Sequence, residues 1–200
     1  MYEDKKAYRT GAEVTMNLNE KTLSSKEIFK GRIIDLYVEQ VELPNGKTST
    51  REIIKHPGAV AVLAITPENK IVMVEQFRKP LERNLVEIPA GKLEKGEEPE
   101  TTARRELEEE TGYTCTHLEP LISFYTSPGF ADELVHLFLA ENLEKLSEAA
   151  ELDEDEFVEV MEVTLEEAEQ MIANKRIYDA KTAYAVQYLQ LKQAMQNSSK

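Results

Sequence analysis

Three glutamates in the middle of the chain have the spacing of a single helical face. Glu106, Glu109 and Glu110 stand at positions i, i+3 and i+4, and at about 100° per residue their carboxylates fall within an arc of about 100°. Like charges placed in this way repel one another. A hard divalent cation such as Mg²⁺ or Mn²⁺ would reverse that penalty, because it takes oxygen ligands and bridges to phosphate oxygens. The alternative is an acidic face that is simply solvated.

The composition of the chain is that of a globular protein, whose strands and helices must position these glutamates. Its 200 residues are 41% hydrophobic and 31% charged, which predicts one domain with at most a small appendage. The formal net charge of −14 argues against nucleic-acid partners but permits a phosphorylated small molecule at a site where cations invert the potential. The longest apolar run, residues 59–65, is too short to span a membrane, no secretory signal is visible, and Cys115 is the single cysteine. We therefore expect a cytoplasmic protein without a membrane partner.

The hydrophobic pattern predicts an N-terminal β hairpin followed by a domain of mixed strands and helices. Residues 1–25 show no period and are expected to form a flexible arm, whereas residues 26–56 read as a hairpin that is too small to bury a core alone. Residues 57–200 form the remaining domain. In it we expect strands over 59–65, 71–77, 85–88, 121–125, 134–140 and 157–163, and helices over 99–111, from 164 onward, and over 179–196.

The residues around the glutamates complete a longer pattern. Gly91 is followed after five residues by Glu97, and after seven more by the run Arg-Glu-Leu-Glu-Glu-Glu-Thr-Gly-Tyr over 105–113. This resembles the complete signature of the Nudix hydrolases, and only Tyr113 departs from it, at a position that is more often aliphatic. The resemblance implies an α/β/α sandwich with a mixed sheet and metal-dependent hydrolysis of a nucleoside diphosphate linked to another group. In this pattern Gly91 would permit a tight backbone turn.

The same resemblance implies roles for the residues of the signature. Glu106 and Glu110 would be the principal ligands of Mg²⁺ or Mn²⁺, together with the backbone carbonyl of Ala90. Glu109 would assist the metals or their water. Arg105 would hold a neighbouring carboxylate in place through a paired hydrogen bond.

A second motif narrows the resemblance. Ser127-Pro128-Gly129 is by itself a generic turn, but its distance from the signature resembles that in the ADP-ribose pyrophosphatase subfamily. Glu133 follows at the start of a strand and is a candidate for a catalytic contribution. The acidic stretch 151–156 is either a solvated loop or, as the resemblance implies, the source of a general base at Glu154 and a metal ligand at Glu156.

Four residues occupy positions that the subfamily uses to hold its ligand. Arg78 would pair with phosphate through its planar guanidinium, and Arg51, beside Glu52, would reach the nucleotide from the hairpin. Each arginine could equally be an ordinary surface residue. Arg32 stands where relatives often place an aromatic side chain against adenine, so the adenine contact depends on stacking by a guanidinium.

These observations predict an enzyme that hydrolyses ADP-ribose to AMP and ribose 5-phosphate with Mg²⁺ or Mn²⁺. In the family that the chain resembles, a segment like the hairpin crosses to a partner subunit, so we expect a homodimer. One alternative is a Nudix hydrolase of another nucleoside diphosphate sugar or of a dinucleotide. The other is a non-catalytic ADP-ribose sensor, against which the complete set of signature glutamates counts.

Overall fold

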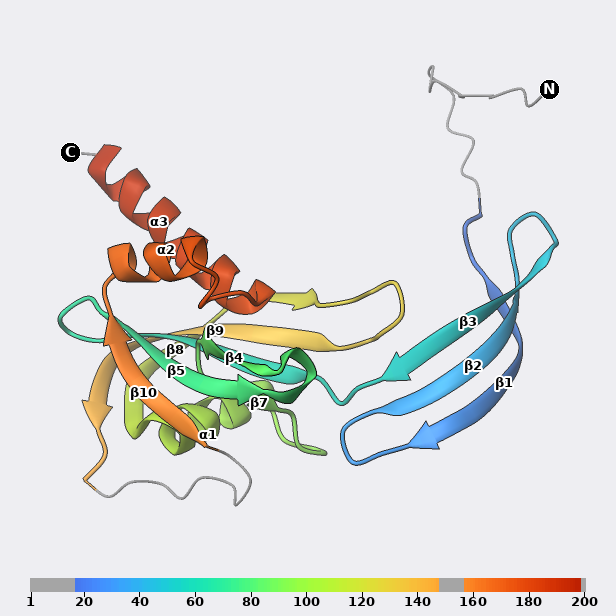
Figure 1. Ribbon diagram of the computed structural model, residues 1–200, viewed down its shortest axis with the longest axis horizontal. Helices are drawn as coiled ribbons and strands as arrows, with labels where there is room; N and C mark the ends of the chain where they lie inside the picture. The colour runs from blue at the N-terminus through green and yellow to red at the C-terminus, as the bar shows by residue number, and fades with distance from the viewer. Residues whose placement is uncertain (1–16, 148–156, 199–200) are drawn as a thin grey trace.

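The N-terminal part of the protein is a three-stranded antiparallel sheet. The computed structural model describes residues 17–147 and 157–198, and its first strands are β1 (Lys21–Lys30), β2 (Asp35–Glu42) and β3 (Thr48–Lys55) in that spatial order. Figure 1 shows this sheet standing to one side of the main body of the molecule. The hairpin prediction was therefore incomplete, because β1 adds a strand that begins inside the segment expected to be a flexible arm. Every residue of β1 is exposed, so its sequence carries no burial pattern that could have announced it.

The main body is built on a seven-stranded mixed sheet. Its central path runs β10-β5-β4-β9-β8, with β6 paired to β5 and β7 paired to β4. The β4 and β9 pair is parallel and the other pairs are antiparallel. The strands are β4 (Ala59–Ile65), β5 (Ile71–Arg78), β6 (Arg83–Glu87), β7 (Ala90–Lys92), β8 (Tyr113–Tyr125), β9 (Leu134–Lys145) and β10 (Val158–Val163), and the short 3₁₀ turn η1 covers Lys79–Leu81.

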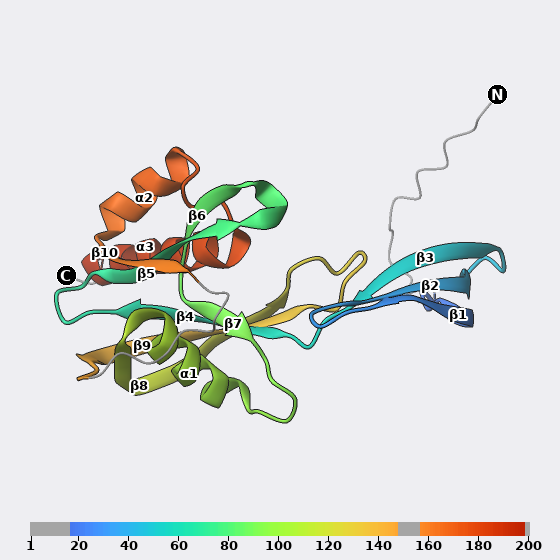
Figure 2. The same ribbon diagram turned by 60° about the horizontal axis from the view of Figure 1, so that its bottom comes forward.

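Helices cover both faces of this sheet, as Figure 2 shows. Helix α1 (Pro99–Thr111) packs on one face, and α2 (Leu165–Ala173) and α3 (Ala180–Ser198) pack on the other. Strand β4 serves both cores: Ala61 and Leu63 face α2 and α3, whereas Val60 and Val62 face α1. The predicted α/β/α sandwich with a mixed sheet is confirmed, and the continuous apolar run of β4 is explained by its burial on both faces. No helix in the described part of the chain is both long and apolar enough to cross a membrane.

Helix α1 has the limits that its sequence predicts. Pro99 occupies the start of the helix, where a missing N–H costs nothing, and Gly112 ends it in the left-handed conformation with φ of 69°. The Gly112 N–H donates to the carbonyl of Glu108 at 2.9 Å. These two signals fix the register of the helix and hence the direction of its three glutamates.

The N-terminal sheet is joined to the main body through the loop that connects β8 to β9. The Ile54 N–H donates to the Phe130 carbonyl at 2.8 Å, and the Asp132 N–H donates back to the Ile54 carbonyl at 3.2 Å. Lys55 Nζ lies 2.9 Å from Asp132 Oδ2. The end of β3 therefore holds the loop that contains Ser127-Pro128-Gly129.

Candidate active site

Helix α1 and the turn at Ala90 and Gly91 bring two buried carboxylates together. Ala103 and Leu107 anchor the helix in the core, and the side of α1 that faces the turn carries Glu106 and Glu110, which are 7% and 4% exposed. The Ala90 N–H donates to Glu110 Oε2 at 2.9 Å. The carboxylates thus lie against two consecutive backbone positions. Burying a carboxylate costs free energy unless it is well paired. Two buried carboxylates side by side therefore indicate a functional site rather than an ordinary helix surface.

The place of Gly91 has a physical reason that the sequence argument missed. Its φ does not lie in the left-handed region, so a tight turn is not what requires glycine here. A Cβ added to Gly91 would instead lie 1.9 Å from the carboxyl carbon of Glu106 and 2.0 Å from its Oε1. Glycine is needed because the Glu106 carboxylate rests directly on the backbone of this turn.

Arg105 is surrounded by carboxylates. Its Nη1 lies 2.9 Å from Glu106 Oε1 and donates to Glu109 Oε2 at 2.8 Å, and its Nη2 donates to Glu97 Oε2 at 3.4 Å. Burial would lower the pKa of Arg105, but the neighbouring carboxylates outweigh it and the pKa is raised. The Thr102 hydroxyl also donates to Glu97 at 2.8 Å, and this bond together with Arg105 lowers the pKa of Glu97. Arg105 therefore contacts three carboxylates.

A second charged group lies beside the turn and includes a residue that sequence reasoning missed. Arg78 donates from Nε and Nη2 to the two oxygens of Glu87 at 2.6 and 2.7 Å, and Lys181 Nζ also contacts Glu87. Glu87 is 2% exposed. Burial would raise its pKa, but the hydrogen bonds from Arg78 and the charge of Lys181 outweigh this and lower the pKa to about 2. Its only sequence signal is a glutamate inside the apolar run Leu-Val-Glu-Ile over 85–88.

Arg78 is within electrostatic reach of the α1 carboxylates. Its pKa is raised first by the hydrogen bonds to Glu87, and the charge of Glu110 contributes to the same shift. The charge of Glu110 therefore acts on the guanidinium of Arg78, although Glu87 is its hydrogen-bonded partner.

The predicted residues of the N-terminal sheet are not brought to this place within one chain. Arg51 pairs with Glu20 through Nε at 2.9 Å and through Nη2 at 2.5 Å, and Glu52 and Arg32 are exposed. The three-stranded sheet that carries them stands away from α1 in Figure 1.

The remaining predicted acidic residues are Glu133, Glu154 and Glu156. Glu133 accepts a hydrogen bond from the Thr126 hydroxyl at 2.5 Å, and its Oε1 lies 3.8 Å from Nε2 of His56. It belongs to the loop held by β3, and its described partners are not the signature glutamates. Glu154 and Glu156 lie outside the described residues.

The donor chemistry of the turn fits a hard divalent cation. Among residues 17–147 and 157–198, no three acidic, histidine or cysteine side chains are arranged as a finished metal-ligand cluster. The Glu106 carboxylate nevertheless occupies the space that a Cβ at Gly91 would fill, and the Glu110 carboxylate accepts the Ala90 N–H. These carboxylates and the Ala90 carbonyl are all oxygen donors, which Mg²⁺ and Mn²⁺ prefer.

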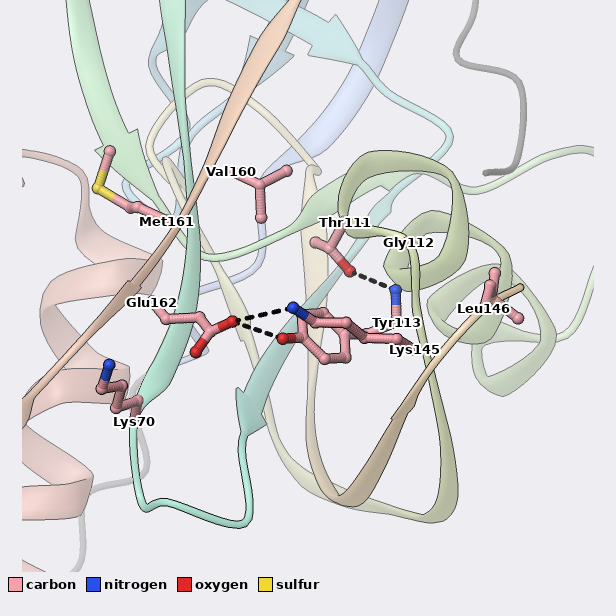
Figure 3. Close-up of a pocket in the computed structure, with 9 residues that line it drawn as sticks. All are labelled: Lys70, Thr111, Gly112, Tyr113, Lys145, Leu146, Val160, Met161 and Glu162. Atoms are coloured by element: carbon pink, nitrogen blue, oxygen red, sulfur yellow. Dashed lines mark hydrogen bonds and ion pairs between the residues drawn. The ribbon is translucent and has the colours of Figure 1, made fainter. Parts of the chain in front are cut away.

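A separate hollow of about 570 Å³ opens beyond the C-terminal end of α1, and Figure 3 shows its lining. The Tyr113 hydroxyl donates to Glu162 Oε1 at 2.5 Å, and Lys145 Nζ lies 5.3 Å from the centre of the Tyr113 ring. Neither Glu106 nor Glu110 lines this hollow. Tyr113 itself is buried in the core on the α1 side, so it fills the packing position that is more often aliphatic.

Comparison with known proteins agrees with this geometry. The family model of the NUDIX domain matches residues 55–184. The chain belongs to the Nudix family. A second family model, the nucleoside diphosphate sugar hydrolase N-terminal domain, matches residues 20–54, which are the three-stranded sheet. Nudix hydrolases typically depend on a divalent metal ion.

Two bacterial relatives cover nearly the whole chain. An ADP-ribose pyrophosphatase of Bacillus subtilis (strain 168) is 71% identical over 180 residues, which are 90% of this chain and 97% of the relative. A methanol dehydrogenase activator of Bacillus methanolicus is 66% identical over 178 residues, which are 89% and 96% of the two chains. A crystal structure of an ADP compounds hydrolase shares the fold with a TM-score of 0.77 at 18% identity, covering 88% of this chain and 95% of that one.

Proposed function

We propose that this Nudix protein is an ADP-ribose pyrophosphatase that hydrolyses the diphosphate of ADP-ribose to AMP and ribose 5-phosphate. The observation that carries the proposal is the 71% identity, over 90% of the chain, to a relative of that name. The pair of buried carboxylates on the turn at Ala90 and Gly91 supports it. The single, buried cysteine is in keeping with a cytoplasmic enzyme.

The two buried glutamates of α1 and the turn at Ala90 would together hold Mg²⁺ or Mn²⁺. Glu106, Glu110 and the Ala90 carbonyl are the donors, with Glu156 as a further ligand by resemblance. When bound, the metal neutralises charge on the diphosphate and stabilises the leaving phosphate. Glu109, held by Arg105 at 2.8 Å, assists at the edge of this site.

The other side chains bind and orient the reactants. Arg78 presents its guanidinium to a phosphate. Glu154 takes the proton of the attacking water as general base, and Glu133 is the second candidate for that role. The protein acts mainly through position and electric field, as expected for hydrolysis of a phosphoric anhydride.

The proposal is tested by metal-dependent release of AMP from a small panel of substrates. In Mg²⁺ we expect kcat/KM for ADP-ribose to exceed that for ADP-glucose and GDP-mannose by at least about tenfold. Glu110→Gln should lower turnover by at least about a hundredfold. Glu141→Gln, at a partly exposed ion pair with Lys192, serves as the matched control. Equal efficiency with GDP-mannose would reject the ADP-ribose preference. Tight binding of ADP-ribose without release of AMP would instead favour the sensor.

A second candidate function is the activation of a methanol dehydrogenase. It is favoured by the 66% identity to a relative with that name. The test adds the full-length protein to a methanol dehydrogenase and measures the rate of alcohol oxidation, with Glu110→Gln in parallel. Stimulation by the wild type alone would tie activation to hydrolysis, and no stimulation by either protein would exclude this function.

We further propose a homodimer in which the N-terminal sheet completes the site of the partner subunit. The division into an arm (1–25), a dimerising β segment (26–56) and a catalytic domain (57–200) belongs to this proposal, with the observation that the sheet already begins at Lys21. Three apolar side chains of β1 and one in the turn that follows it are about half exposed in the single chain, at Leu23, Ile28, Phe29 and Ile33. Exposed apolar side chains in such a small sheet are typical of an interface.

Light scattering and mixed dimers test this assembly. Deleting residues 1–56 should give an aggregated or monomeric, inactive chain. A sharper test mixes Arg51→Ala with Glu110→Gln under exchange of subunits. If Arg51 acts across the interface, only mixed dimers hold an intact site, and about a quarter of wild-type activity should return. A well-behaved wild-type monomer, or no recovery in the mixture, would contradict the shared site.

A further inference from the structure

The buried carboxylate of Glu87 binds two cationic side chains, three residues before Ala90. It ends β6, is 2% exposed, and is held by both Arg78 and Lys181. Removing a carboxylate from water costs several kcal/mol unless its oxygens are fully paired. Arg78 could be solvated at the surface without this partner, so the burial of Glu87 is not needed to satisfy the arginine. We therefore expect Glu87 to fix the positions of the residues around it.

Arg78 is only partly used by this contact. The bidentate pair engages Nε and one N–H of Nη2, which leaves three of the five guanidinium N–H groups without a partner in the part of the chain that the structure describes. The Arg78 side chain is 38% exposed. A bidentate carboxylate fixes the plane of a guanidinium. Glu87 therefore sets the direction in which the remaining N–H groups of Arg78 point.

The start of helix α3 also contacts the end of strand β6 and the residue after it. Lys181 reaches Glu87, and the Thr182 hydroxyl accepts a hydrogen bond from the Ile88 N–H at 3.1 Å. Asp179 Oδ1 accepts from Lys181 Nζ at 2.9 Å and from the Thr182 N–H at 3.1 Å. The first turn of α3 thus binds both the Glu87 side chain at the end of β6 and the backbone N–H of Ile88.

These contacts end at Ile88, two residues before Ala90, whose turn contacts the buried carboxylates of α1. Ile88 is followed by Pro89 and by Ala90, whose N–H binds Glu110. In Figure 2, β6 lies near α2, and the chain then passes to β7 near α1. Glu87 is the last residue of β6, and β7 begins three residues later at Ala90.

We propose that Glu87 is a positioning residue of the active site: it aligns the Arg78 guanidinium with the diphosphate and, with Lys181, ties helix α3 to the turn at Ala90. This inference rests on the proposed function, because it takes Arg78 to bind the diphosphate of the substrate. Glu87 does not touch the substrate. Its effect is transmitted through Arg78, so loss of Glu87 should change substrate binding in the same way as loss of the Arg78 fork.

The test measures KM and kcat separately on the full-length protein. Glu87→Gln retains the shape but replaces one acceptor oxygen by a donor, so Arg78 loses its fixed orientation. We expect KM to rise about tenfold or more while kcat stays within about threefold. Arg78→Lys, which lacks the planar fork, should give the same pattern. Glu141→Gln, at the partly exposed ion pair between β9 and Lys192 of α3, is the matched control and should leave both constants unchanged.

The double variant separates positioning from a merely structural role. If Glu87 acts through Arg78, Glu87→Gln combined with Arg78→Lys should raise KM no further than either single change, so the effects are not additive. Additive losses, or a lower melting temperature with an unchanged KM, would overturn the proposal. If Glu87→Gln does not fold, Glu87→Asp keeps the charge but withdraws it by one methylene, and a folded Glu87→Asp with unchanged KM would also overturn it.

The substrate panel keeps the two proposals distinguishable. The cycle is measured with the nucleoside diphosphate derivative that the wild type hydrolyses best. A preference for a compound other than ADP-ribose would reject the proposed substrate and leave the coupling between Glu87 and Arg78 open to measurement. Additive effects with ADP-ribose as the preferred substrate would reject the coupling alone.

Discussion

The substitution Gly91→Ala tests the geometry of the turn more directly than removal of a carboxylate. The added Cβ would lie 1.9 Å from the Glu106 carboxyl carbon, whereas Cβ contacts below 3.0 Å are essentially never found. The carboxylate must therefore retreat by about 1 Å or more. It is the far end of a flexible side chain, so the displacement is cheap for the fold. The backbone of Gly91 itself is in a region open to alanine.

The displacement acts on a group whose position decides the chemistry. A shift of about 1 Å in a positioned group can cost about a hundredfold in rate, so we expect Gly91→Ala to lower kcat by about 10². The free energy of unfolding should change by less than about 1 kcal/mol, because only the end of one side chain moves and alanine restricts the unfolded chain. The expected signature is a folded protein with an impaired metal site.

The assay measures AMP release from ADP-ribose across a Mg²⁺ titration, with urea unfolding of the same samples. Glu141→Gln, at the ion pair with Lys192 of α3, is not among the predicted site residues and is the control. We expect Gly91→Ala to need more Mg²⁺ and to stay slow at saturation. Wild-type kcat and Mg²⁺ dependence in a folded Gly91→Ala would refute the argument that Glu106 must rest on this turn.

Two further predictions concern single carboxylates. Glu154→Gln should lower kcat by about 10²–10⁴ with nearly unchanged KM, as expected for a general base, and a larger kcat loss in Glu133→Gln would move that role to Glu133. The pKa of Glu87 is lowered from 4.5 to about 2 in the folded protein. The ionised carboxylate therefore stabilises the fold at pH values above 4.5, and this stability is lost as the pH falls from 4.5 toward 2. Urea unfolding at pH 5 and pH 3 should show the wild type losing about 2 kcal/mol more than Glu87→Gln, and equal losses would contradict the pairing.

The fold was predictable where burial or an end signal left a mark in the sequence. Helix α1 runs over Pro99–Thr111 as expected, because a proline and a glycine mark its ends. The double-sided burial of β4 was also correct. Strand β1 left no such mark, since all its residues are exposed and it is held by backbone hydrogen bonds to β2. Pairing of that kind depends little on side-chain type.

The site was predictable in its residues but not in their contacts. The spacing of Glu106 and Glu110 on one helical face was correct, yet the role of Gly91 as a seat for a carboxylate needed coordinates. Glu87 was missed because sequence patterns treat a charge in an apolar run as an interruption. Its partner Lys181 lies far along the chain, at the start of α3. Long-range pairs of this kind leave no local spacing to detect.

Arg105 offsets part of the repulsion among the glutamates of α1. Repulsion among the glutamates at i, i+3 and i+4 was the first reason to expect a cation, but the guanidinium already contacts Glu106 at 2.9 Å and Glu109 at 2.8 Å. The chain thus supplies part of the compensating charge itself. The case for a metal site therefore depends less on repulsion than on burial: Glu106 and Glu110 are held away from water against the backbone of one turn. A solvated acidic face would leave these two carboxylates exposed, so the structure argues against that alternative.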